Sequence, residues 1–447
     1  MPVNSDQILS TLDAALKRSP ADATEMVYIG VRDATTRFAE NGIHQNMLSS
    51  DGRVIVRLMK DGRVAVSSTN NLSTAGLDRA IADAMEIASF LAPDAGFPGF
   101  VKSEPAPVVE TFYPAVDTCP PERRSSAVSE IVDLAKLAGV QASGLFRLTT
   151  NRVAVTNSSG TRQYSEETVA ELSVSASDDP TLGQGWSTGV SHDIDRLDSK
   201  TLGRIAIDKA VRSRNPQPLP AGEYTVILEP AAVGQLLLFL GFLAFSGKSF
   251  AEGHGLLSGK IGEVVTGTNI SIDDDPFLPA FVGMPFDFEG VPKRKIALIE
   301  NGVARGVAHD SRSAKLAGAE STGHALPADN PRGPYPKNLT LAPGDATVEQ
   351  MIASTSMGLL ITHFWYINYL NPMKAQVSGS TRDGTFLIEN GAATKPVRNL
   401  RATPAILEAF SKADQIGKDR VLYPQYSAAL YVPTMKIASM TFVEDTD

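Results

Sequence analysis

The sequence predicts an α+β fold with an N-terminal α/β lobe on a mostly antiparallel sheet and a C-terminal, strand-rich lobe curled around one buried apolar helix. Three observations lead to this prediction. Helical periodicities alternate with hairpin patterns over 1–217, turn signals separate short strands over 218–447, and the most apolar run lies at 231–245. Strands that follow one another as hairpins pair in the antiparallel sense.

Proline-rich stretches mark the expected boundaries along the chain. One such stretch is 93–121 and the other is 215–220. We therefore expect an N-terminal α+β domain over 1–104, a central segment of helix, hairpin strands and helix over 105–217, and a C-terminal strand-rich domain over 218–447.

The N-terminal lobe should have helices where apolar residues recur every three or four positions, and strands where short apolar runs end in turn signals. Turn pairs at 41–42 (Asn-Gly) and 61–62 (Asp-Gly) favour tight hairpins. The expected elements, in order, are a helix over 5–16, strands over 26–32 and 36–40, a hairpin over 54–67, helices over 75–91 and 121–137, strands over 145–149, 153–156 and 168–176, and a helix over 197–213.

The C-terminal lobe should begin with a strand over 224–228, followed by the apolar helix. Pro230 suits the first turn of that helix and Gly247 suits its end. A run of about 15 apolar residues is too short to cross a bilayer, so a buried core helix is expected. The remaining expected elements are a glycine-rich loop over 246–267, an acidic turn over 273–275, hairpins over 295–308 and 386–397, a strand over 358–362, and one or two strands over 429–443.

The composition narrows the class of protein. The chain has 447 residues, 43% of them apolar and 20% charged, as in ordinary globular proteins. No apolar run reaches membrane-spanning length, and the N-terminus lacks a signal-peptide pattern. The chain has a single cysteine, Cys119, as is common in the reducing cytoplasm. These observations together favour a cytoplasmic location for the protein. The net charge of −9, without a basic cluster, disfavours direct nucleic-acid binding.

From about Met26 to Val443 the chain resembles the TldD/PmbA family, peptidases that older descriptions call modulators of DNA gyrase. In the zinc-carrying TldD subunits of that family the matching segment reads V-x-L-x-P-x-x-x-G-x-L-L-H-E-x-x-x-H. This chain keeps the frame of that segment at Val226, Leu228, Pro230, Gly234, Leu236 and Leu237. Two further family patterns are also present, an Asn-Ser-x-Gly turn at 157–160 and a Phe-Asp-x-Glu-Gly segment at 286–290.

The zinc motif itself is replaced. Its first histidine falls on Leu238, its glutamate on Phe239 and its second histidine on Leu243. Leucine and phenylalanine neither bind zinc nor carry a proton. The resemblance further implies a C-terminal cysteine as third ligand in TldD subunits, and this chain has no cysteine after Cys119. It therefore implies a PmbA/TldE-type subunit without catalytic residues or a cofactor of its own, with zinc in a TldD-type partner.

Other metal sites remain open as alternatives. The most ligand-like fragment is Glu252-Gly253-His254, and a zinc site could combine His254 with His309, His324 and a carboxylate, since catalytic zinc needs three convergent protein ligands. The acidic turn over 273–275 is a candidate calcium or magnesium site but lacks the spacing of an EF-hand loop. Neither a Gly-x-Ser-x-Gly nucleophile motif nor a phosphate-binding loop occurs.

The densest aromatic stretch of the chain is 363–372. Tryptophan and tyrosine combine a large contact area with a polar group, so such a stretch fills a core or forms an interface. The expected peptide-binding or interface residues are Trp365, Tyr366, Tyr369, Arg382 and Asp383.

The leading functional hypothesis is a non-catalytic subunit of a TldD/TldE-type zinc metallopeptidase that acts on unfolded or leader peptides. The chain would supply scaffold and part of a peptide chamber, as a heterodimer with a TldD-type subunit or as a homodimer. One alternative is a self-sufficient homodimeric hydrolase that uses His254 with Asp273 or Asp274. The other is a peptide- or protein-binding regulator without enzymatic activity.

Overall fold

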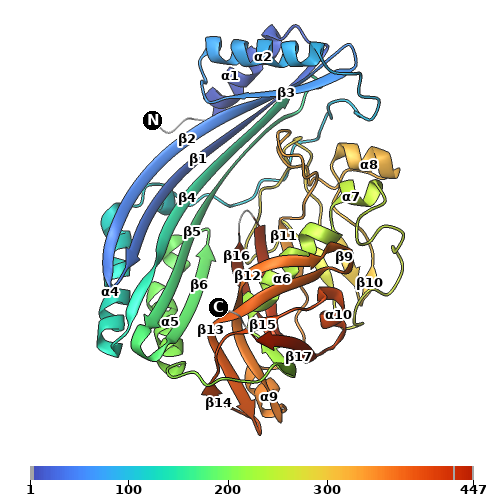
Figure 1. Ribbon diagram of the computed structural model, residues 1–447. Helices are drawn as coiled ribbons and strands as arrows, with labels where there is room; N and C mark the ends of the chain where they lie inside the picture. The colour runs from blue at the N-terminus through green and yellow to red at the C-terminus, as the bar shows by residue number, and fades with distance from the viewer. Residues whose placement is uncertain (1–4, 426–427, 445–447) are drawn as a thin grey trace.

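The computed structural model describes residues 5–425 and 428–444 and divides them between two lobes (Figure 1). The N-terminal lobe contains a six-stranded antiparallel sheet, and the C-terminal lobe contains an eleven-stranded mixed sheet. This confirms the predicted α+β fold.

The N-terminal sheet has the strand order β3-β2-β1-β4-β5-β6. Its strands are β1 (Ala23–Ala39), β2 (Gly42–Lys60), β3 (Arg63–Thr69), β4 (Gln141–Asn157), β5 (Arg162–Asp178) and β6 (Gly183–Ser191). The long strands arch over the C-terminal lobe in Figure 1. Because β1 to β3 and β4 to β6 form one sheet, the stretches 1–104 and 105–217 share a single continuous framework.

The two strands expected at 26–32 and 36–40 are one strand, β1, and those at 145–149 and 153–156 are one strand, β4. Polar residues between the apolar runs suggested that each strand ends and a second one begins there. In the structure Asp33 on β1 meets Arg147 and Thr149 on β4, so these polar groups pair across the half-buried face of the sheet.

Helices cover the convex face of this sheet in two groups (Figure 1). The first group is α1 (Ser5–Arg18) and α2 (Thr74–Ser89), and the second is α4 (Pro121–Ala138) and α5 (Ser199–Arg212), with the short α3 (Pro114–Asp117) nearby. Met26 and Tyr28 pack under the first group, and Ala34 and Phe38 under the second. The opposite, concave face is left to the C-terminal lobe.

Strand β6 was not predicted, because its sequence is rich in glycine, which weakens a strand pattern. The glycines allow helix α5 to lie very close to the strand. A Cβ atom added at Gly185 would stand 2.1 Å from the carbonyl oxygen of Ala206, and one at Gly183 would stand 2.5 Å from that of Ala210.

We expect Gly185→Ala to lower the free energy of unfolding by about 2–3 kcal/mol, because the helix backbone must move away from β6. The matched control is Gly222→Ala, where the nearest atom, on Tyr224, lies at an ordinary 3.7 Å. The control should change stability by less than about 1 kcal/mol. Urea denaturation of the three proteins measures the difference, and equal stabilities for both variants would contradict the close-packing explanation.

The C-terminal sheet closes on itself. Its order is β10-β9-β8-β11-β17-β15-β13-β12-β7, and β7 also pairs with β17. The strands are β7 (Gly222–Leu228), β8 (Ile272–Asp274), β9 (Ile296–Glu300), β10 (Val303–Ala304), β11 (Asn338–Leu341), β12 (Met357–Asn371), β13 (Gln376–Glu389), β14 (Ala392–Pro396), β15 (Leu400–Ala402), β16 (Ala413–Gln425) and β17 (Ala428–Glu444). The helices of this lobe are α6 (Pro230–Ala244), α7 (Gly247–Ala251), α8 (Ser311–Ala317), α9 (Val348–Ala353) and α10 (Ile406–Ser411).

Helix α6 is the apolar helix of the prediction, and it packs against β12, β16 and β17. It ends before Phe245 and not at Gly247, which instead begins α7. Gly247 is needed there because a Cβ atom would stand 2.4 Å from Nδ1 of His309. No helix in the described part of the chain combines the length and apolar character that a membrane crossing requires.

One other detail of the C-terminal lobe differs from expectation. The segment expected as an acidic turn enters the sheet as β8, so that Asp274 is fully buried. The stretch 429–443, for which one or two strands were expected, forms a single strand, β17.

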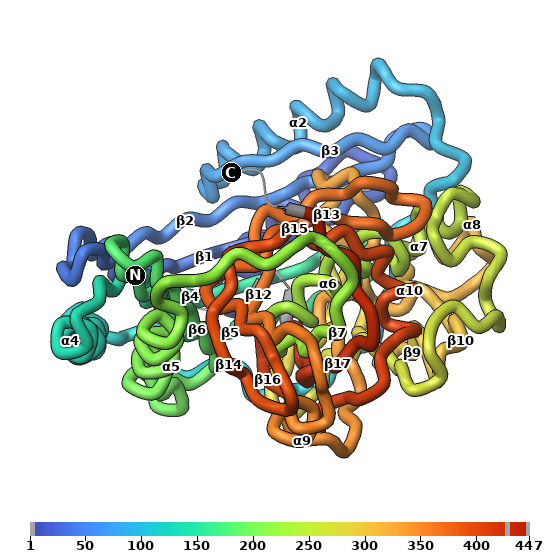
Figure 2. Tube along the Cα trace, turned by 60° about the horizontal axis from the view of Figure 1, so that its bottom comes forward, coloured from blue at the N-terminus to red at the C-terminus, as the bar shows by residue number. Residues whose placement is uncertain are grey.

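The lobes meet along two lines. Val27 and Ile55 on the concave face pack against Phe286 and Phe288 of the C-terminal lobe. At the other edge, β6 lies beside β13 and β16, as the turned view shows (Figure 2).

Candidate functional site

The three positions that the resemblance aligns with the zinc motif line one cavity of about 760 Å³ beside α6. Leu238 is fully buried, while Phe239 and Leu243 are half-buried. All three belong to the C-terminal half of α6, whose nearly all-round apolar sequence fixes the helix in the core and turns this side toward the cavity.

Aromatic side chains from outside α6 complete the wall. Tyr369 meets Phe239 edge to face with ring centroids 5.1 Å apart, and Tyr335 stacks on Phe242 at 4.8 Å. The guanidinium of Arg332 lies 5.7 Å from the centre of the Phe242 ring. Burial raises the pKa of Tyr369 to about 12, and that of Tyr335 rises as well for the same reason, so both phenols are neutral near pH 7. The cavity therefore offers apolar surface with a few hydroxyl groups.

The side chains that line this cavity do not fit a zinc ion. Histidine, cysteine, aspartate and glutamate are all missing from the wall, whereas Arg332 and Lys337 add positive charge. Over residues 5–425 and 428–444, no three such ligand side chains come together anywhere. Because zinc in proteins is held by nitrogen, thiolate and carboxylate ligands, we derive no metal-dependent step for this cavity.

The histidines proposed as alternative ligands have other partners. His254 is exposed and lies 3.7 Å from the carboxylate of Glu252. His324 is completely buried, with Nε2 2.8 Å from Asp274 Oδ2 and Nδ1 2.9 Å from Thr322 Oγ1. His309 Nδ1 lies 3.1 Å from Ser313 Oγ.

The pairing of His254 with Asp273 or Asp274 is therefore not assembled. Asp274 is bound by His324 and by the backbone N–H of Asn338, while Asp273 and Asp275 each lie 3.1 Å from Lys295 Nζ. A buried histidine that uses both ring nitrogens for hydrogen bonds stabilises the local fold and has no free nitrogen for a substrate.

The predicted aromatic residues lie in the half of β12 that leads to its turn into β13. Trp365 is 46% exposed and Tyr366 72% exposed, and the guanidinium of Arg382 lies 4.7 Å from the centre of the Trp365 ring. Tyr369 belongs to both this surface and the cavity wall. Asp383 behaves differently: its carboxylate lies 2.7 Å from His363 Nε2, and the ring of Trp186 lies against the His363 imidazole at a centroid distance of 4.6 Å.

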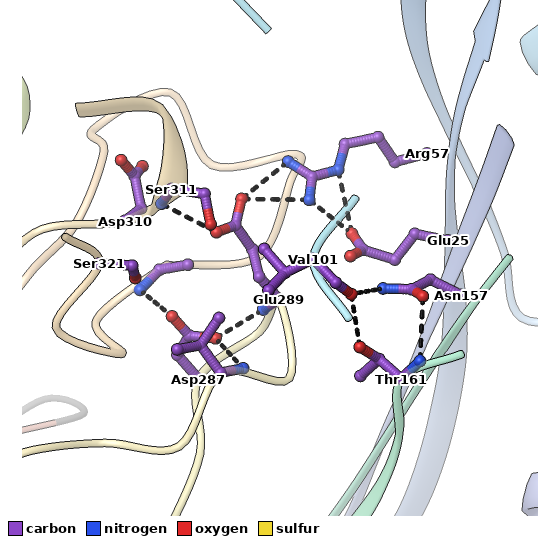
Figure 3. Close-up of polar contacts among 12 residues, drawn as sticks. Glu25, Arg57, Val101, Asn157, Thr161, Asp287, Glu289, Asp310, Ser311 and Ser321 are labelled. Atoms are coloured by element: carbon purple, nitrogen blue, oxygen red, sulfur yellow. Dashed lines mark hydrogen bonds and ion pairs between the residues drawn. The ribbon is translucent and has the colours of Figure 1, made fainter. Parts of the chain in front are cut away.

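A buried polar network joins the two lobes (Figure 3). Arg57 on β2 contacts Glu25 on β1 at 2.7 Å and Glu289 of the C-terminal lobe at 3.2 Å. Phe97 and Phe100 lie against the same guanidinium, with ring centres 5.7 and 5.2 Å away. The side chain of Arg57 is 16% exposed and that of Glu25 only 1%.

This network explains the two family patterns that sequence reasoning left without a role. Asp287 accepts hydrogen bonds from the backbone N–H groups of Glu289, Val291 and Ala325, so it fixes the turn that carries Glu289 toward Arg57. Asn157, in the other pattern, and Thr161, the residue directly after that pattern, both donate to the carbonyl oxygen of Val101 and so hold the linker on the sheet (Figure 3).

The network predicts a pH dependence of stability. Burial raises the pKa of Glu25 to about 7; the positive charge of Arg57 lowers this pKa, and the negative charge of Glu289 raises it further. Burial beside Glu289 also raises the pKa of Asp287. A carboxyl group with a raised pKa in the folded state stabilises fully below its ordinary pKa and loses that contribution as the pH rises through the folded value.

We therefore expect the free energy of unfolding to fall between pH 5 and pH 8, and Glu25→Gln to reduce that fall by about 2 kcal/mol. Urea denaturation at a series of pH values measures both slopes. The exposed Glu130→Gln is the control and should keep the slope of the original chain. A Glu25→Gln slope identical to that of the control would show that Glu25 does not titrate in this window.

Three family descriptions match consecutive parts of this chain. PmbA/TldA metallopeptidase domain 1 matches residues 25–88, the central domain matches 70–214, and the C-terminal domain matches 221–444. The chain belongs to the PmbA/TldD family.

Curated relatives of this chain are named as metalloproteases. The chain is 26% identical over 244 residues to a metalloprotease of Methanothermobacter thermautotrophicus, which covers 52% of this chain and 51% of that protein. It is 26% identical over 296 residues to the metalloprotease PmbA homolog of Haemophilus influenzae, covering 62% of this chain and 63% of that protein. The chain spans about half the length of the first of these curated relatives.

Solved structures share the fold over nearly the whole chain. TldE from Thermococcus kodakarensis superposes with a TM-score of 0.89 and 22% identity, covering 97% of this chain and 100% of that one. A Thermotoga maritima protein described as a modulator of a DNA gyrase gives a TM-score of 0.85 with 19% identity, covering 98% and 100%. At these identities the likeness concerns the fold.

Proposed function

We propose that this chain is a non-catalytic, PmbA/TldE-type subunit of a zinc metallopeptidase whose metal is held by a TldD-type partner. The observation that carries the proposal is the apolar wall formed by Leu238, Phe239 and Leu243, at the positions of the family's metal ligands and general base. Zinc activates water through ligands that these side chains cannot replace. The chemistry would then take place in the partner.

The substrate class follows from the character of the cavity. Apolar and aromatic walls with a few hydroxyl groups suit the apolar side chains of an extended peptide. A folded protein buries such side chains in its core and could not present them to the cavity. We therefore propose unfolded peptides, such as the leader segments of precursor peptides, as substrates of the complex. In this arrangement the chain supplies scaffold and part of a peptide chamber, and we place the complex in the cytoplasm.

The partner surface that we propose is the exposed end of the β12–β13 hairpin. Besides Trp365 and Tyr366 it carries Leu370, 55% exposed, and Met373, 66% exposed. Large exposed aromatic and apolar side chains in one place are typical of interfaces, where tryptophan and tyrosine contribute much of the binding energy. Tyr369 connects this surface to the cavity beside α6, so a partner bound here would stand next to the cavity.

The double substitution Trp365→Ser with Tyr366→Ser tests this surface. We expect the dissociation constant for a TldD-type partner to rise at least 30-fold, since hot-spot aromatics each contribute about 2 kcal/mol or more. Isothermal titration calorimetry with the purified partner measures the change. The control is Leu137→Ser on α4, 86% exposed and far along the chain from the hairpin, which should leave the dissociation constant within twofold. Unchanged binding by the double variant would exclude the hairpin as the interface.

A further inference from the structure

A second cavity, of about 390 Å³, lies between the concave face of the N-terminal sheet and the C-terminal lobe. Strand residues such as Val31, Val153 and Val169 form one wall, and Phe281 and Met284 form part of the other. Two lysines, Lys293 and Lys337, reach this space, and the sheet side of its wall also carries Arg147, Glu167 and Glu171.

Among the described residues no anion touches Lys293, and Asp274, Glu167 and Asp287 attract its charge only from a longer distance. Lys293 is 6% exposed, and within residues 5–425 and 428–444 its ammonium group makes no hydrogen bond or ion pair. Lys337, half-buried, has its ammonium 4.9 Å from the centre of the Phe288 ring and likewise no carboxylate within ion-pair distance in the described chain. Burying a charged group without a partner costs several kcal/mol, so two such groups at one cavity indicate a missing anion.

The carboxylates around these lysines interact with other groups, and Glu171, on the same wall, lies opposite Arg147 on β4. Glu167, on the sheet side of the cavity, accepts a hydrogen bond from Asn151 Nδ2 at 3.0 Å. Asp274 is bound to His324 and to the backbone N–H of Asn338. Burial, followed by the repulsion from Lys293, lowers the pKa of Lys337 to about 8, so Lys337 is still largely charged near pH 7.

We infer that this cavity between the lobes binds a small organic carboxylate with an apolar side chain, held by the ammonium groups of Lys293 and Lys337. The α-carboxylate of a free amino acid and that of the last residue of a short peptide share this chemistry. The apolar strand residues and Phe281 would contact the side chain of the ligand. The inference concerns this chain alone and does not depend on a partner subunit or on peptidase activity.

The test uses N-acetyl-L-leucine and its uncharged amide, N-acetyl-L-leucinamide, titrated into the full chain by isothermal calorimetry at pH 7. We expect the acid to bind at least tenfold more tightly than the amide, because only the acid provides the anion. Titration of free leucine and of glycyl-leucine distinguishes the two sources: the tighter ligand identifies an amino-acid site or a peptide-terminus site.

Substitutions assign the effect to the two lysines. Lys293→Met and Lys337→Met should each weaken binding of the acid at least tenfold, whereas Lys260→Met, at an exposed position outside the cavity, should leave it within twofold. Circular dichroism checks that each variant is folded, and the comparison of acid with amide on the original chain needs no variant at all. Equal binding of acid and amide, or inorganic phosphate binding more tightly than the acid, would overturn the inference.

Discussion

Arg57→Met is expected to lower the free energy of unfolding by about 3–5 kcal/mol at pH 8, because it leaves two buried carboxylates without their shared cation. Glu25 and Glu289 contact the same guanidinium, and among the described residues Glu25 Oε2 has no hydrogen-bond partner even in the intact network. The loss should be smaller at pH 5, where Glu25, with its pKa raised to about 7, is protonated. Urea denaturation at the two pH values measures both effects.

Arg53→Met is a matched control on the same strand. Arg53 also joins the lobes, through an ion pair with Asp329, but the two side chains are 43% and 31% exposed. Exposed ion pairs contribute about 0–1 kcal/mol, so the control should stay within that range. If both variants lose the same small amount, the network of Figure 3 does not hold the lobes together.

Leu238→His, which restores the first histidine of the family's zinc motif, is expected to lower the free energy of unfolding by about 2–4 kcal/mol. Leu238 is fully buried, so the change removes apolar packing and places an imidazole where the cavity wall offers no acidic partner. Thermal and urea denaturation measure the loss, and elemental analysis of the same variant should show no bound zinc.

The control for this prediction is Leu238→Met, which preserves volume and apolar character and should cost less than about 1.5 kcal/mol. If the Leu238→His variant is as stable as the Leu238→Met variant, position 238 tolerates a polar side chain and does not belong to the hydrophobic core.

Local patterns were sufficient to predict most elements of the fold. The apolar run that forms α6 and the hairpin over 386–397 each depend on a few neighbouring residues, and both features appear where expected. Strand β6 was missed because its glycines weaken the strand pattern, while their role is to leave room for helix α5, which packs on the strand. The place of β8 inside the sheet depends on pairing with β9 and β11, which no local pattern encodes.

In the candidate site, too, local features could be predicted from the sequence and contacts between distant residues could not. The motif frame placed Leu238, Phe239 and Leu243 on one helix, and the structure shows that they line one cavity. By contrast, Arg57 and Glu289 are 232 residues apart in sequence, and sequence reasoning had no signal for their contact. An alignment of relatives with paired changes at these two positions could have provided one.

The most direct test of the central claim is the zinc content and peptidase activity of this chain, purified alone and after co-expression with a TldD-type partner. Elemental analysis by mass spectrometry and cleavage of an unfolded peptide are measured on both samples. We expect no zinc and no cleavage for the chain alone, and about one zinc per heterodimer together with cleavage for the complex. Stoichiometric zinc or cleavage by the chain alone would contradict the proposal that this subunit is non-catalytic.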